Sequence, residues 1–202
     1  FAGYDRYFFV NLAESLIRLP PVSKKAFRLF GEYTLMLHPN NHTERMNRFL
    51  SSLSLPFHSR YQNYNSFFSQ GGKNNLYSSE FKRTAGKNNT YQLYQRLFDP
   101  KLDPLDNALQ MDINTYLPDD LLYKSDSASG AFGLELRSPF LDHTLMEKIA
   151  LMPSQKKLLF TNKKKILKEI AYRFNLLPKE IINRPKHGFT IPLNKWFKGS
   201  LG

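Results

Sequence analysis

The chain has 202 residues and a formal net charge of +12, and residues 154–202 alone hold 12 of its 29 basic side chains but only 2 of its 17 acidic ones. Hydrophobic residues make up 41% of the sequence and aromatic residues 14%, which is enough to build a core and excludes global disorder. The absence of cysteine excludes disulfides, thiolate zinc sites and a cysteine nucleophile.

Helical periodicity dominates the first residues. Phe8, Leu12 and Leu16 recur every four residues and predict a helix with one buried face, ended before Pro20. Ser23 is expected to cap a second helix. The buried face of that helix is expected to comprise Ala26, Phe30, Tyr33 and Leu37.

A third helix is expected where Asn41 and Glu44 have the spacing of a capping box. Its apolar face is expected to comprise Met46, Phe49, Leu50 and Leu53. Residues 54–90 mix aromatic side chains with asparagine, serine and glycine, which indicates short helices and turns. Helical spacing returns at residues 91–98 and 102–116.

The last third of the chain also reads as helical. Pro118 suits the first position of a helix, with Asp119 and Asp120 in the first turn where the helix dipole favours negative charge. Further helices are expected over residues 138–152 and 162–174. No alternating apolar run is long enough to build a sheet, so the predicted fold class is mainly α, an irregular assembly of several helices.

The charged side chains of residues 112–143 stand in an otherwise apolar stretch. Because an unpaired buried charge is strongly destabilising, we expect these side chains to find partners or a ligand. The alternative is that Arg137 pairs with a nearby carboxylate and that Asp119 and Asp120 only stabilise a helix start. The sequence lacks phosphate-loop, dinucleotide-binding and zinc-protease motifs, and no metal ligands are predicted.

Two lysines are candidates for anion binding. Lys164 and Lys168 are one helical turn apart, and a lysine near a helix start can bind phosphate as a point charge. The alternative is that these lysines only form a solvated helix face, as lysine runs usually do. Lys186 follows Pro185, which fixes the backbone, and precedes Gly188, which permits a close approach. Lys186 is therefore the best single candidate for a functional side chain.

Four stretches together resemble the C-terminal synthetase domain of glutamine-hydrolysing asparagine synthetases. They are FAGYDRY at residues 1–7, the segment 112–143, the helix carrying Lys164 and Lys168, and NRPKHGF at residues 183–189. The resemblance implies the helical C-terminal portion of an α/β adenine-nucleotide-binding domain of the ATP-pyrophosphatase type. The family's nucleotide loop and glutaminase domain are not in this sequence, so we expect residues 1–202 to be inactive alone.

The resemblance also implies a reaction. In that family Mg-ATP, with Mg2+ as cofactor, adenylates the aspartate side chain, and ammonia from glutamine then displaces AMP to give asparagine. Lys186 matches the family lysine that stabilises the adenylation transition state, Lys164 matches the lysine that contacts pyrophosphate, and Asp126 matches an aspartate lining the active-site side. The implied partners are aspartate or a related carboxylate, glutamine or ammonia, and the upstream parts of the parent enzyme, in the cytoplasm and without a membrane.

Some positions depart from the family pattern and leave alternatives open. Ser127 and Gly130 stand where the family usually has arginine and methionine, which leaves the acceptor carboxylate undecided. A basic helical module that binds nucleic acid would account for the charge of residues 154–202 but not for the four stretches. A segment that serves only in assembly is the third reading, and a homodimer is left open.

Overall fold

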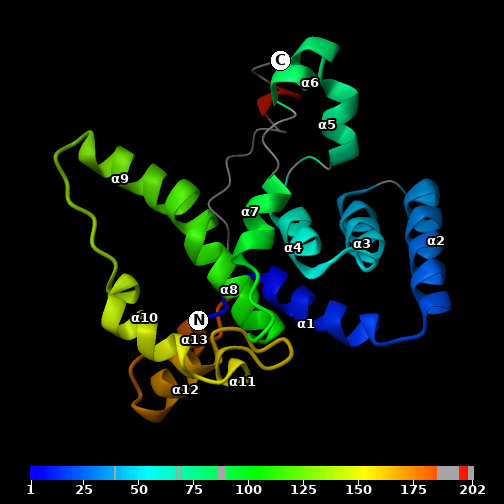
Figure 1. Ribbon diagram of the computed structural model, residues 1–202. Helices are drawn as coiled ribbons and strands as arrows, with labels where there is room; N and C mark the ends of the chain where they lie inside the picture. Colours follow the sequence, from blue (N-terminus) through cyan, green and yellow to red (C-terminus); the bar gives the residue numbers. More distant parts are fainter. Residues whose placement is uncertain (39, 67, 69, 86–89, 186–195, 200–202) are drawn as a thin grey trace. The chain divides into compact units, whose positions relative to one another are not determined.

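The computed structural model describes residues 1–38, 40–66, 68, 70–85, 90–185 and 196–199, and these form helices (Figure 1). Among them there is no strand, only an isolated antiparallel bridge between Leu159 and Asn162, so the mainly α class is confirmed. The chain divides into two compact units, residues 1–165 and 166–202.

The first unit contains α1 (Asp5–Ile17), α2 (Pro21–Leu37), α3 (Asn41–Ser52), α4 (Phe57–Asn65), α5 (Gln70–Leu76), α6 (Ser79–Ala85), α7 (Thr90–Leu97), α8 (Pro104–Asn114), the π-helix η1 (Leu117–Leu122), α9 (Tyr123–Gly130), the 3-10 helix η2 (Pro139–Leu141), α10 (His143–Ala150) and α11 (Ser154–Lys157). Then come α12 (Lys165–Arg173) and α13 (Lys179–Ile182). Within the second unit, the Asn183 side-chain amide donates to the Tyr172 hydroxyl at 2.6 Å.

The main core of the first unit lies where α1 packs against α8 (Figure 1). Tyr7 and Val10 of α1 join Leu105, Ala108 and Met111 of α8 in one fully buried cluster. The small side chain of Ala108 lets the two helices approach closely, and tyrosines of α4 and α7 close the cluster from the other side. This packing brings residues 1–7 next to the start of the segment 112–143.

The buried face predicted for α1 is wrong. The fully buried positions of α1 are Tyr7, Val10 and Ala13, whereas Phe8 and Leu12 line an open cavity. Periodicity finds an apolar face, but α1 has two, and the helix buries the one that fits against α8. Leu16 does pack, in a second core with Ala13 and residues of α3.

Helices α2 and α3 form a hairpin, and the predicted face of α2 is again wrong. Phe30, Tyr33 and Leu37 are exposed, while Gly31 is buried against α3. A Cβ added at Gly31 would lie 2.9 Å from the Asn47 side-chain oxygen, so the glycine allows the close approach that decides which face packs. The face predicted for α3 is confirmed, since Leu50 and Leu53 are buried with Met46 and Phe49 against them.

Several predicted helix ends are displaced. Helix α2 begins directly after Pro20 rather than at a Ser23 cap. Asn40, not Asn41, caps α3, and its side-chain oxygen accepts from the Thr43 amide at 3.0 Å. The cap forms one residue earlier because the Thr43 hydroxyl accepts the Asn40 backbone N–H in return, at 3.0 Å.

Later elements differ in length from the prediction. The helix expected over residues 138–152 is split into η2 and α10, and Asp142 caps α10 by accepting from the Leu145 amide at 3.0 Å. The helix expected from residue 162 begins only at Lys165, because Lys164 has a φ of 55° that no right-handed helix accommodates. Pro118, Asp119 and Asp120 do open a helix, of the π type.

The buried core predicts a clear difference between two methionines. Met111 is 0% exposed and Met36 is 83% exposed. Met111→Ala removes packed atoms and leaves a cavity, so the free energy of unfolding should fall by about 2–5 kcal/mol. Met36→Ala should change it by less than about 0.5 kcal/mol. Urea titrations followed by circular dichroism measure both, and equal losses would contradict the assigned core.

Candidate functional site around residues 1–7

An ion pair between Arg6 and Asp112 ties the first residues of the chain to α8. Arg6 donates to one Asp112 oxygen from Nε at 3.1 Å and from Nη2 at 2.8 Å, and the two side chains are 15% and 8% exposed. The Tyr7 hydroxyl donates to the same oxygen at 2.5 Å. Asn65 of α4 donates to the other oxygen at 3.3 Å. The buried carboxylate is therefore fully supplied with donors, as a buried charge requires.

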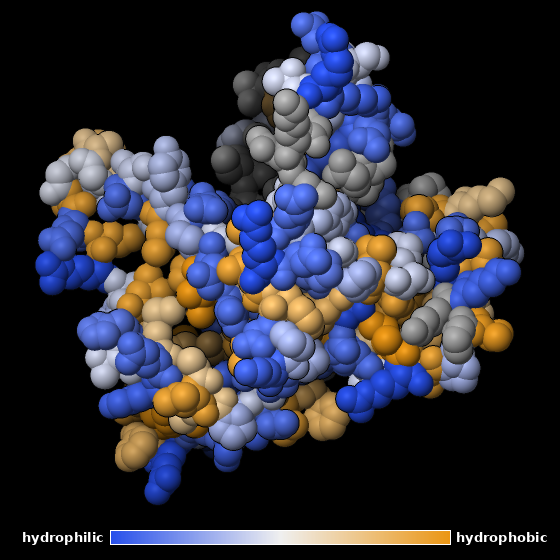
Figure 2. Space-filling model, viewed as in Figure 1, coloured by the Kyte–Doolittle hydropathy of each residue, from blue (hydrophilic) through white to orange (hydrophobic). Residues whose placement is uncertain are grey.

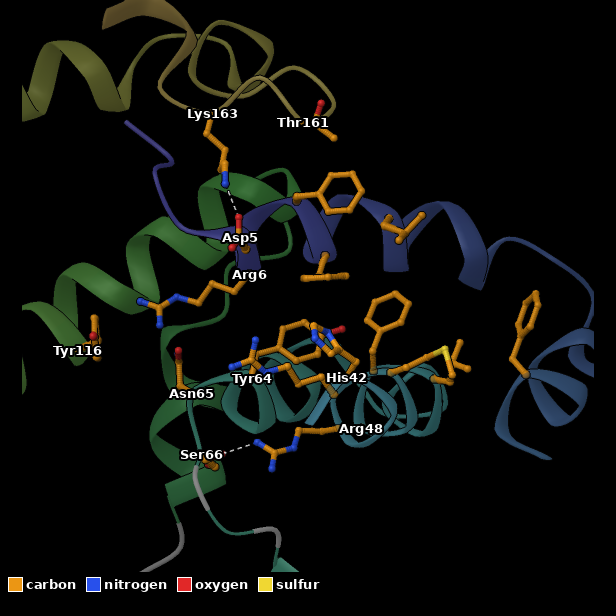
Figure 3. Close-up of a pocket in the computed structure, with 18 of the residues that line it drawn as sticks. Asp5, Arg6, His42, Arg48, Tyr64, Asn65, Ser66, Tyr116, Thr161 and Lys163 are labelled. Carbon is orange, nitrogen blue, oxygen red and sulfur yellow. Dashed lines mark hydrogen bonds and ion pairs between the residues drawn. The ribbon is translucent and has the colours of Figure 1, made fainter. Parts of the chain in front are cut away.

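Two tyrosine rings enclose the Arg6 guanidinium. Its central carbon lies 4.5 Å from the centre of the Tyr4 ring and 4.4 Å from that of Tyr116, which directly precedes η1. The ring faces are electron-rich, so both contacts favour the cation in a place where water is largely excluded. Figure 3 shows Arg6, Tyr116 and Asn65 converging on this point. Residues 1–7, α4, α8 and η1 thus meet around one guanidinium.

The buried pair shifts the protonation of its neighbours. Burial raises the pKa of Tyr7, and the adjacent Asp112 carboxylate raises it further. Burial also raises the pKa of Tyr61, with Tyr7 and Asp112 adding to the effect. Burial lowers the pKa of Arg6, but the nearby Tyr61, Asp112 and Tyr7 outweigh it and the net direction is upward. Both tyrosines are held neutral and the arginine is held charged.

Three lysines lie near residues 1–7, and two of them have acidic partners. Lys157 is buried, pairs with Asp106 at 2.5 Å and donates to the Ala150 carbonyl at 3.1 Å. Lys163 pairs with Asp5 (Figure 3). Lys164 is exposed and has no acidic partner among the residues that the structure describes.

The Lys164 side chain passes close over Gly3. A Cβ added at Gly3 would lie 2.9 Å from the Lys164 Cε, so a larger residue there would displace the flexible end of the lysine side chain. The Phe1 ring packs edge-on against Phe140 with 5.3 Å between ring centres. Three of the four stretches that carried the resemblance, residues 1–7, 112–143 and the lysine turn before α12, therefore meet in one place.

The predicted site residues have different outcomes. Lys164 lies beside residues 1–7 but in a left-handed turn rather than on a helix with Lys168. Asp126 is exposed on α9, and no hydrogen bond or ion pair joins it to Lys164. Lys186 lies outside the residues that the structure describes. Arg137 pairs with Glu135 at 2.7 Å, but the side chains are 83% and 73% exposed, so this pair is not a buried one.

Sequence reasoning missed Arg6, although it expected the charged side chains of residues 112–143, which include Asp112, to find partners. The available signal is the placement of one basic residue between the aromatic residues Tyr4 and Tyr7 in FAGYDRY. Among the described residues, no three histidine, aspartate or glutamate side chains group closely enough to hold a metal ion. In the same part of the chain, no helix combines the length and apolarity needed to cross a membrane.

The whole chain, residues 1–202, matches the family model described as asparagine synthase. The chain therefore belongs to the asparagine synthase family, as the resemblance of the four stretches predicts.

Individual relatives match over shorter lengths. Glutamine-hydrolysing asparagine synthetase 1 of Bacillus subtilis (strain 168) is 33% identical over 96 residues, which are 47% of this chain and 15% of that protein. The asparagine synthetases of Cricetulus griseus and Homo sapiens are 41% and 40% identical over 80 residues, 37% of this chain and 14% of each relative. The chain thus spans a small part of these relatives. No solved structure matches it.

Removing the carboxylate at Asp112 should be strongly destabilising. Asp112→Ala leaves a buried arginine without its counter-charge, and the free energy of unfolding should fall by about 3–5 kcal/mol. The double variant Arg6→Met/Asp112→Leu should lose less than Asp112→Ala, because no unpaired charge remains. Glu135→Ala, which breaks an exposed pair, should cost under about 1 kcal/mol. Urea titrations measure the free energy of unfolding of each variant. A double variant that is less stable than Asp112→Ala would contradict the argument.

The raised tyrosine pKa values predict a loss of stability in alkali. Tyr7 stays protonated in the fold, whereas an unfolded tyrosine ionises near its ordinary pKa of 10.0. Above that pH the unfolded state binds fewer protons than the folded state, so the free energy of unfolding falls as pH rises, by up to about 1.4 kcal/mol per pH unit for each such tyrosine. Below pH 10 this contribution is fully present.

Tyr7→Phe should make that fall shallower by about the same slope between about pH 10 and pH 11.5. Tyr123→Phe is the matched control, because Tyr123 is exposed and its loss should leave the slope unchanged. Urea unfolding at a series of pH values measures both slopes. Equal slopes for wild type and Tyr7→Phe would show that Tyr7 ionises in the fold as it does when unfolded.

Proposed function

We propose that this chain is part of an ATP-dependent ligase that activates a carboxylate and amidates it with ammonia from glutamine. Aspartate is the proposed carboxylate substrate. The products would be asparagine, AMP and pyrophosphate. Membership of the asparagine synthase family and the printed names of the relatives support this reaction. Because the chain spans only 14–15% of those relatives, the rest of the reaction machinery is assigned to other parts of the protein.

The observation that carries the proposal is the state of Lys164. Its neighbours Lys157 and Lys163 are neutralised by Asp106 and Asp5, whereas Lys164 is exposed and has no acidic partner in the described part of the chain. Its side chain lies close over Gly3, beside residues 1–7. A lysine without a counter-charge suits an anionic group such as pyrophosphate.

The described residues fit one end of Mg-ATP. Lys164 would hold phosphate oxygens, and the described residues hold no cluster of ligands for Mg2+, so the phosphates and other parts of the protein would have to supply them. When bound, Mg-ATP supplies the AMP that activates the carboxylate and the pyrophosphate that leaves. The task of this chain is to place a fixed positive charge where phosphate charge redistributes.

Two further roles are proposed from the resemblance. Asp126 would line the active-site side of the domain, and its exposure on α9 leaves it accessible to a ligand. Lys186 would stabilise the transition state of carboxylate activation. Residues 1–202 would form the C-terminal helical part of the synthetase domain, working with a nucleotide-loop region and a glutaminase domain in the cytoplasm.

The lysines of residues 154–165 argue against the alternative that the chain is a nucleic-acid-binding module. It needs an accessible basic surface, but Lys157 is buried and Lys163 is engaged with Asp5. The positive charge of residues 154–165 is thus partly neutralised, by one buried ion pair and one at the surface. No observation favours a purely structural role over the enzyme.

The test is aspartate-dependent exchange of label between pyrophosphate and ATP, measured in the complete protein that contains residues 1–202. Lys164→Ala should lower kcat/KM for pyrophosphate about 10- to 100-fold, the range for a lost hydrogen bond to a charged group. Lys156→Ala removes a neighbouring exposed lysine and should change it less than twofold.

Two results would contradict the proposal. Unchanged exchange in Lys164→Ala would show that Lys164 does not bind pyrophosphate. Absence of exchange with aspartate and with other carboxylates would show that the proposed reaction does not occur. Exchange with a different carboxylate alone would keep the reaction and correct its acceptor.

A further inference from the structure

A cavity of about 1270 Å³ opens beside α1, between that helix and α3 and α4 (Figure 3). Its size exceeds the roughly 300–1,000 Å³ typical of small-molecule sites, so it has room for a bulky ligand. All its lining residues belong to the first unit. Its apolar lining residues come from α1, α2 and α3 and include Phe8, Phe9, Leu12, Phe30 and Phe49.

Aromatic rings form a continuous wall along this cavity. The ring centres of Phe8 and Phe9 are 5.4 Å apart, those of Phe9 and Phe49 5.3 Å, and those of Phe49 and Tyr64 6.3 Å. The wall runs from α1 across α3 to α4. Phe8 of this wall and Leu12 lie on the face of α1 that periodicity predicts to be buried. In the structure this apolar face lines the cavity instead.

The cavity lining is partly open to water. Phe9 of the wall is exposed, as is Phe30, which also lines the cavity, and Figure 2 shows hydrophobic side chains gathered over the region of α1 to α3. Contiguous apolar surface of this kind marks a binding site, because an apolar occupant gains free energy by removing it from water. Aspartate, which is small and polar, gains nothing from such a wall.

The charged lining residues are unequally paired. Arg6 and Lys163 are neutralised by Asp112 and Asp5, and the remaining acid, Asp120, faces Lys124 at 3.4 Å. The other charged lining residues are two arginines of α3.

Arg45 and Arg48 are three residues apart and so share a face of α3. Neither has an acidic partner among the described residues. Arg48 donates one hydrogen bond, from Nη1 to the Ser66 carbonyl at 3.0 Å, which orders the side chain at the cavity (Figure 3) and leaves its other donors available. The cavity therefore combines an apolar wall with two uncompensated positive charges.

We propose that this cavity binds a single-chain amphiphile with an anionic head group. The apolar chain lies against the aromatic wall, and the carboxylate or phosphate head binds Arg45 and Arg48. Arginine suits both head groups because its planar donors pair with two oxygens at once. Lys164 does not line this cavity, although its neighbour Lys163 does, and the inference stands whether or not the proposed ligase activity is found.

The test measures binding of dodecanoate, dodecyl phosphate and the uncharged dodecanol to the 202-residue chain by equilibrium dialysis below micelle-forming concentrations. We expect saturable binding of one or both anions and weaker binding of dodecanol. Comparing dodecanoate with dodecyl phosphate decides which head group the arginines prefer. No ATP is present, so the result does not depend on the ligase proposal.

Charge reversal tests the arginines directly. Arg45→Glu/Arg48→Glu should weaken binding of the preferred anion at least about tenfold, as expected for lost charged hydrogen bonds, and should leave dodecanol binding unchanged. Arg45→Gln/Arg48→Gln should fall between this variant and wild type. Lys82→Glu/Arg83→Glu carries the same charge change on the exposed surface of α6 and should bind like wild type.

Three outcomes would overturn the proposal. They are no saturable binding of either anion, equal weakening by the α3 and α6 variants, and equal affinity for dodecanol and the anions. Circular dichroism melting of each variant shows whether weaker binding comes from unfolding. If the glutamate variant unfolds, Arg45→Gln/Arg48→Gln is compared with wild type instead, because it introduces no new charge.

Discussion

The first unit is organised around the desolvated ion pair between Arg6 and Asp112. Removing two charges from water is unfavourable unless every donor and acceptor finds a partner, and this pair recruits its partners from several elements. Tyr7 belongs to α1, Asn65 to α4 and Tyr116 to the start of η1. Satisfying one carboxylate and one guanidinium therefore fixes how α1, α4 and α8 approach one another, and the apolar core of Val10, Leu105 and Met111 fills the space that results.

The same arrangement partly neutralises the excess positive charge that begins at residue 154. Lys157, at the end of α11, pairs with Asp106 of α8, and Lys163, in the turn before α12, pairs with Asp5 of α1. Lys164 follows in a left-handed turn over Gly3 and is left with its charge exposed. The net charge of the chain thus says less about its partner than the positions of the cations, such as Lys164, that have no acidic partner among the described residues.

Helix α1 shows why a chain rich in aromatic residues can leave an apolar surface open. Its Tyr7 and Val10 face packs against α8, and its Phe8 and Leu12 face lines the cavity. One helix cannot turn both faces toward the same neighbour, and the hairpin of α2 and α3 packs with α1 in the second core around Ala13. The gap that remains is lined by aromatic rings and arginines, which is the chemistry of a site rather than of a packing defect.

The sequence by itself determined the mainly helical class, the membership of the asparagine synthase family and the apolar face of α3. These follow from composition, periodicity and motif spacing, which are local properties of the chain. It did not determine which face of α1 or α2 is buried, where α12 begins, or that Arg6 is the partner of Asp112. Each of those depends on contacts between residues far apart in sequence, such as Gly31 with Asn47, Gly3 with Lys164, and Arg6 with Asp112 across 106 positions. Only the tertiary structure decides them, because close approach and burial are properties of pairs of elements and not of any one segment.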